Sequence, residues 1–163
     1  MRILKIVAIL MVALVVAAVC VVGYYFTTAK VSVVAVSAQA VLAEDASARF
    51  TELRKQVEEG VFQGTLYSDA AIGDAKDYVF VTYTLRLSNQ CLVPIDMIEV
   101  QAVPKAVDVL KLGDRNVYSL GARSEGDISA TILTSKDVGA LRELVVTYYV
   151  WGVSFSIRER YGG

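Results

Sequence analysis

The chain has 163 residues, with 16 basic and 17 acidic side chains, a net charge of −1 and no histidine. This balance lacks the excess of positive charge that a nucleic-acid partner requires, so none is expected. The absence of histidine removes the commonest general base and the commonest metal ligand. We therefore predict that the protein is not an enzyme and that it has no catalytic residues, cofactor or metal site.

Residues 6–26 form an unbroken run of 21 residues without a charged side chain. As a helix rising about 1.5 Å per residue, this run would be roughly 32 Å long, enough to cross a bilayer. A cleaved signal peptide has a shorter apolar core, and the valine before Cys20 is a poor match to a lipoprotein site. The run is therefore predicted to be an uncleaved signal-anchor, with the lipid bilayer as its partner and with residues 1–29 forming a cytoplasmic stub and the transmembrane helix.

The orientation of this span follows from its flanking charges. Arg2 and Lys5 precede it, whereas Lys30 is the only basic residue shortly after it. Because positive charge is retained in the cytoplasm, the N-terminus is predicted to be cytoplasmic and residues 30–163 extracytoplasmic. Arg2 and Lys5 at one end, and Tyr24 and Tyr25 at the other, are expected at the membrane interfaces of a single-pass cell-membrane protein.

The first part of the domain combines a strand and a helix. Residues 31–37 are rich in β-branched side chains and predict a strand. Five apolar residues then recur at spacings of three and four: Leu42, Ala46, Phe50, Leu53 and Val57. This stripe predicts one amphipathic helix at about residues 39–59, which Gly60 would end.

From residue 61 onward, apolar residues recur with a period of two. The clearest strand is 77–89, in which apolar side chains alternate with threonine, arginine and serine, as in a half-buried antiparallel strand. Further strands are predicted at 61–67, 97–103, 107–112, 116–120, 128–133, 144–151 and 153–160. Gly152 would be the turn between the last two. The short, evenly spaced strands favour a mainly β fold, an antiparallel β-sandwich carrying one inserted helix.

The two cysteines and residues 131–135 bear on possible chemistry. Cys20 lies in the span and Cys91 beyond it, so an internal disulfide is not expected; Cys91 is read as a small buried residue, with a disulfide to a partner chain as the alternative. Residues 131–135 (TILTS) are superficially similar to the catalytic segment of sortases. Serine replaces the nucleophilic cysteine there, and the chain has no histidine to act as base.

Tyr149 and Trp151 are the candidate partner-contact residues. If Tyr148 and Val150 face inward, these two aromatic side chains project together from the opposite face of the strand. They would then form a platform for a protein partner or a glycan. The alternative is that the helix at about 39–59 covers them.

Residues 77–89 and 120–133 (LGARSEGDISATIL from position 120) resemble bacterial immunoglobulin-like ectodomains, in particular those of functionally uncharacterised single-pass membrane proteins of Gram-positive bacteria. The order of Asn89, Pro94 and Ile95 is also loosely similar to that in water-stress (late-embryogenesis-abundant) domains. These resemblances imply an immunoglobulin-like β-sandwich without catalytic residues. The expected function is a membrane-tethered interaction or scaffolding module with a protein partner in a cell-envelope complex. A ligand-binding module for envelope polysaccharide or a small molecule is the alternative.

Overall fold

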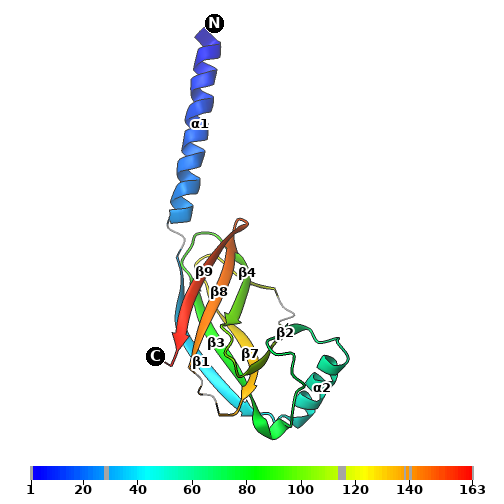
Figure 1. Cartoon of the computed structure of the whole chain (residues 1–163). Helices are drawn as coiled ribbons and strands as arrows, with labels where there is room; N and C mark the ends of the chain where they lie inside the picture. Colours follow the sequence, from blue (N-terminus) through cyan, green and yellow to red (C-terminus); the bar gives the residue numbers. More distant parts are fainter. Residues whose placement is uncertain (1, 28–29, 114–116, 138, 140, 163) are drawn as a thin grey trace.

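The computed structural model describes residues 2–27, 30–113, 117–137, 139 and 141–162 (Figure 1). A long helix, α1 (Arg2–Thr27), leads into a mainly β part that begins with β1 (Val31–Leu42). Figure 1 shows α1 extending away from the β part, with the β8–β9 turn pointing toward its C-terminal end.

Helix α1 is apolar on every side. Its residues Ile3–Tyr25 have a mean hydropathy of 3.2, and no part of the most apolar stretch is buried by the rest of the chain. At about 1.5 Å per residue the segment is roughly 34 Å long. The prediction of an apolar helix here is confirmed, and by length and composition it is able to cross a membrane.

The described strands form two antiparallel sheets. The first contains five strands in the order β1-β3-β7-β5-β2, with β2 (Gly64–Leu66), β3 (Tyr78–Asn89), β5 (Asp108–Leu112) and β7 (Glu125–Ser135). The second contains four strands in the order β6-β4-β8-β9, with β4 (Ile95–Ala102), β6 (Tyr118–Leu120), β8 (Arg142–Val150) and β9 (Val153–Tyr161). The predicted mainly β class with antiparallel strands is confirmed.

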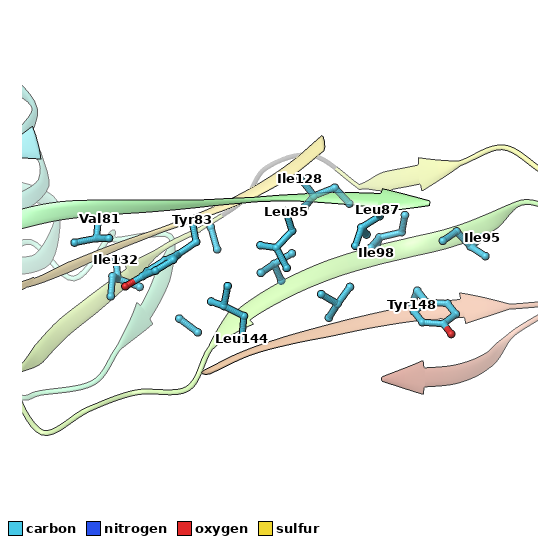
Figure 2. Packing of buried hydrophobic residues seen from close by; sticks show 14 of the residues in the cluster. Val81, Tyr83, Leu85, Leu87, Ile95, Ile98, Ile128, Ile132, Leu144 and Tyr148 are labelled. Carbon is cyan, nitrogen blue, oxygen red and sulfur yellow. The ribbon is translucent and has the colours of Figure 1, made fainter. Parts of the chain in front are cut away.

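The main core lies between the two sheets. On β3, the alternating residues predicted to face inward are buried: Val79, Val81, Tyr83, Leu85 and Leu87. They pack with side chains from β4, β7 and β8, including Ile98, Ile132 and Leu144 (Figure 2). The alternation of apolar residues in the sequence therefore correctly predicts that this face of β3 is buried.

A second, smaller core lies on the outer face of the five-stranded sheet. Helix α2 (Ser47–Glu58) places Phe50 and Leu53 there, and they pack in one cluster with Phe80 and Leu133. The Arg49 guanidinium lies over the Phe80 ring, 4.9 Å from its centroid. Both β3 and β7 are therefore buried on two faces at the end of the domain far from α1 (Figure 1).

The prediction of a helix at about 39–59 is wrong at its beginning. Residues 39–42 belong to β1, which pairs with β3 from Val31 opposite Asn89 to Leu42 opposite Val79. The helix begins only at Ser47. The backbone hydrogen bonds along this long strand pair prevail over the helical spacing of Leu42 and Ala46, so Leu42 contributes to the sheet instead.

The predicted strand at 61–67 is shorter than expected, since only Gly64–Leu66 pairs with β5. Gly64 and Gly113 lie at this pairing, and a Cβ on Gly113 would clash with the Gln63 carbonyl. The predicted strand at 116–120 is observed as Tyr118–Leu120, and residue 116 lies outside the described residues.

Candidate interaction surfaces

The β8–β9 hairpin contains both aromatic candidates: Tyr149 lies in β8, and Trp151 lies in the turn. Trp151 and Gly152 form the turn, with φ of 48° and 79°, and Val150 pairs with Val153. Two positive φ angles are what a two-residue type I′ turn requires. The expectation that Tyr149 and Trp151 share one strand face is therefore wrong, because Trp151 lies beyond the end of β8.

Tyr149 lies on the outer face of the four-stranded sheet, half-buried between Asp96 of β4 and Ser154 of β9. The alternative expectation, that the inserted helix covers Tyr149 and Trp151, is also wrong. Helix α2 packs on the other sheet, against Phe80.

Trp151 contacts the end of α1. Its ring and that of Tyr25 are 5.7 Å apart between centroids, at an interplanar angle of 72°. Tyr24 and Tyr25 form a second edge-to-face pair, at 6.1 Å. Lys5 lies at the opposite end of α1, and the side chain of Arg2 lies outside the described residues. The structure thus brings together Trp151 and the two tyrosines that the sequence placed at a membrane interface.

Asn89 organises the loops at this same end of the domain. Its side chain is 1% exposed, and its Nδ2 donates hydrogen bonds to the carbonyls of Val93 (3.0 Å) and Gly121 (2.8 Å). Its Oδ1 accepts a hydrogen bond from the Cys91 N–H at 2.9 Å. One side chain therefore holds the β3–β4 and β6–β7 turns together. The sequence signal was an asparagine at the end of a strand, but its partners are not evident from the sequence.

Cys91 is buried and free, and its Sγ lies 3.8 Å from the Lys30 carbonyl oxygen. Burial raises the pKa of this thiol, which favours its neutral form. The reading of Cys91 as a small buried residue agrees with this position. Cys20 is exposed on α1.

A cleft of about 540 Å³ lies beside β7 and is lined by β7 and β4 together with residues of β2, β5 and β6. Glu99 and Lys111 form an ion pair across it, with Nζ and Oε1 3.2 Å apart. Burial raises the pKa of Glu99, but hydrogen bonds from Gln101 and Lys111 outweigh it, so the net pKa is lowered. Met97 also lines the cleft, with a φ of 51°, a left-handed conformation that residues other than glycine adopt uncommonly.

Two strand edges beside this cleft are only partly paired. Within the described residues, β6 pairs with β4 only at Ile95 and Ile98, and β5 pairs with β7 only at 132–134. Before Ile132, β7 pairs with β3 on one side, and among the described residues no strand pairs with it on the cleft side. Such an edge presents backbone donors and acceptors that an added strand is able to pair with. Neither the cleft nor its edges had a signal in the sequence pattern.

At the far end of the domain, Arg142 and Asp108 form a buried ion pair. Burial lowers the pKa of the Arg142 guanidinium, but Asp108 and Tyr83 raise it by more, so the charged form is favoured. Tyr67 lies nearby, and burial together with the Asp108 charge raises the pKa of its hydroxyl. The pair is sealed from solvent, with both side chains at most 1% exposed, which fits a structural role.

The described residues contain no group of three or more histidine, cysteine, aspartate or glutamate side chains placed to hold a metal ion. A comparison with protein-family models found no match, and neither did a search of curated proteins.

Proposed function

We propose that the protein is a single-pass membrane protein whose β domain acts outside the cytoplasm as a tethered interaction module of a cell-envelope complex. The observation that carries this proposal is the apolar helical segment Ile3–Tyr25, whose most apolar stretch is not buried by the rest of the chain, next to a domain with a hydrophobic core of its own. Helix α1 ends at Thr27 and β1 begins at Val31, so the domain would stand directly on the membrane.

The contact between Tyr25 and Trp151 supports an uncleaved anchor over a removable signal sequence. A signal sequence that is removed makes no lasting contact with the mature domain. Arg2 and Lys5 before the span favour a cytoplasmic N-terminus, as the positive-inside rule requires. The two antiparallel sheets, together with the resemblance at 77–89 and 120–133, support an immunoglobulin-like sandwich for the domain.

The cleft beside β7 is the proposed partner site. Met97 is 58% exposed and Val117 is 78% exposed at its lining, and the partly paired strand edges offer backbone groups. Apolar side chains beside an open strand edge suit an extended protein segment, which supplies its own backbone and alternating side chains. A small molecule or polysaccharide is the second candidate, because a cavity of about 540 Å³ lies in the range of ligand sites.

Site-specific photocrosslinking in cells tests the partner site. A crosslinking residue at Met97 or Val117 of the full-length protein is expected to give one discrete protein adduct. The control is Ser156, which is exposed on β9 away from the cleft, and it should give none. Equal labelling from all three positions, or no adduct from the cleft, would reject the interaction role. An adduct that carries carbohydrate without protein would favour the second candidate.

A further inference from the structure

We infer that the β8–β9 turn is a second point of membrane contact, with the Trp151 indole in the interfacial layer of the bilayer that α1 crosses. This inference rests on the proposed anchoring of α1. It adds a lipid-binding surface on the folded domain, which fixes how the domain stands on the membrane.

The depth of Trp151 follows from its neighbour. Tyr25 is the last residue of the apolar segment Ile3–Tyr25, so a spanning α1 places this ring at the level of the lipid headgroups. The Trp151 ring is 5.7 Å from it. The depths of the two rings therefore differ by at most 5.7 Å between centroids, comparable to the thickness of one interfacial layer, so the indole lies at or near the interface when the helix spans.

The side chains around this contact have the character of an interfacial surface. Trp151 is 53% exposed, and two more exposed apolar side chains lie at the same end of the domain: Val153 beside the turn and Leu92 in the β3–β4 loop. The loop is next to the start of β1, since the Gln90 N–H donates to the Lys30 carbonyl at 2.9 Å. Tryptophan is the residue most suited to this layer, because its ring is apolar and its N–H needs a polar partner.

The basic residues nearest these loops complement the headgroups. Lys30 follows α1 in the sequence and is exposed, and Arg123 is exposed in the β6–β7 turn, where its N–H donates to the Cys91 carbonyl at 3.2 Å. If the inference holds, these two exposed basic side chains are available to lipid phosphates at this end of the domain. A lipid surface is therefore favoured over a protein partner, because this surface is continuous with the span itself.

The backbone of the turn gives an independent indication. Trp151 has a φ of 48°, a conformation that asparagine, aspartate or glycine adopts with less strain at the first position of a type I′ turn. The only tryptophan of the chain therefore occupies a position that turn formation alone would not select. A contact made by the indole accounts for its presence there.

Because Trp151 is the only tryptophan, its fluorescence reports this contact directly. The full-length protein would be reconstituted in vesicles of phosphatidylcholine and phosphatidylglycerol, with no other protein present. Lipids carrying a quencher near the headgroup, lipids carrying it at the chain end, and aqueous iodide would be compared. We expect emission shifted to the blue, strong quenching by the shallow lipid label, weaker quenching by the deep label and a loss of iodide quenching.

The matched control moves the fluorophore to the other end of the same hairpin, as Trp151→Phe/Arg160→Trp. Arg160 is exposed on β9, about 23 Å along the strand from the turn. Its tryptophan should be quenched by iodide and not by either lipid label.

Flotation of the vesicles separates the two proposals. Protein that fails to float with the lipid overturns the anchoring and the inference together. Protein that floats, but whose Trp151 is quenched by iodide as strongly as the control, overturns the inference alone. Shielding from iodide without quenching by either lipid would mean that a second copy of the chain covers the indole, and would also overturn it.

Discussion

Arg142 and Asp108 form a two-pronged ion pair, with distances of 2.5 and 2.9 Å, that joins the start of β8 to the start of β5 across the two sheets. Asp108 also accepts the Lys105 N–H at 2.6 Å. Within the described residues, the Arg142 Nε is the one buried side-chain polar atom without a hydrogen-bond partner. Because the Arg142 guanidinium is buried, its charged form depends on the counter-charge of Asp108.

Removing one member of this pair should therefore be costly. Asp108→Asn leaves the guanidinium buried without a counter-charge, and we expect a loss of about 3–5 kcal/mol in the free energy of unfolding. Arg54→Met serves as the control, because it breaks the exposed Arg54–Glu58 pair on α2 and should cost less than about 0.5 kcal/mol. Urea unfolding of the full chain in detergent measures both. Equal effects of the two substitutions would contradict the structural role of the buried pair.

Substitution of Asn89 should also lower the stability of the domain strongly. Asn89→Ala leaves the Cys91 N–H and several carbonyls near the β3–β4 and β6–β7 turns without their partner, and should lower stability by about 2–4 kcal/mol. Asn89→Asp should be only partly tolerated, since a carboxylate accepts from Cys91 but donates to no carbonyl. The exposed neighbour Gln90→Ala is the control. Thermal unfolding followed by circular dichroism makes the comparison, and a stable Asn89→Ala variant would refute this account of the turns.

The backbone conformation of the β8–β9 turn should make a substitution at Gly152 destabilising. Gly152 has a φ of 79°, which an L-residue with a Cβ adopts at a cost of about 1–2 kcal/mol. Gly152→Ala should therefore be destabilised by that amount. In Gly121→Ala, the new Cβ would meet only the Ser124 Oγ, at 3.4 Å, in ordinary contact, and we expect little change. If the two alanine variants unfold at the same urea concentration, the positive φ at Gly152 is wrong.

Stability should fall at alkaline pH. Burial raises the pKa of Cys91 and of the Tyr148 hydroxyl, and burial with the Asp108 charge raises that of Tyr67. The folded protein thus binds these protons more tightly than the unfolded chain. The contribution of these groups to the free energy of unfolding is complete below the pKa values that they have in the unfolded chain. It is lost as the pH rises through their higher pKa values in the folded protein, from about pH 9 upward.

Tyr67→Phe tests one of these groups. It removes one titrating hydroxyl while keeping the ring, so the urea midpoint should decline less steeply above about pH 9 than in the unaltered chain. Tyr24→Phe is the control, because it removes a tyrosine hydroxyl from a side chain that is exposed on α1, outside the cores of the β part. A decline of the same slope in the Tyr67→Phe variant would exclude Tyr67 as a contributor.

The parts of the fold that were predictable are those in which one local pattern decides the outcome. The unbroken apolar run predicted α1, and the alternation of apolar residues along β3 predicted which face of that strand is buried. The start of α2 was not predictable in this way, because Leu42 and Ala46 fit a helix locally while residues 39–42 pair with β3 over a long distance. Tertiary pairing prevailed over local spacing there.

The candidate sites were predictable only in part. Trp151 was chosen as a partner-contact candidate from the alternation of side chains along the strand predicted at 144–151, but its place in a turn depends on the φ angles of two residues. The Arg142–Asp108 pair and the cleft near Met97 join residues that are far apart along the chain. No spacing rule links such positions, so the sequence carried no signal for them.

The central claim, an uncleaved anchor with an external domain, is tested most directly by protease treatment of intact cells that carry the full chain with a cytoplasmic N-terminal tag. After alkaline extraction, the account predicts that the membrane retains the tagged full-length protein. External protease should then remove the β domain and leave a tagged fragment containing α1. A chain that has lost residues 6–26, or a β domain that is digested only after the cells are lysed, would contradict it.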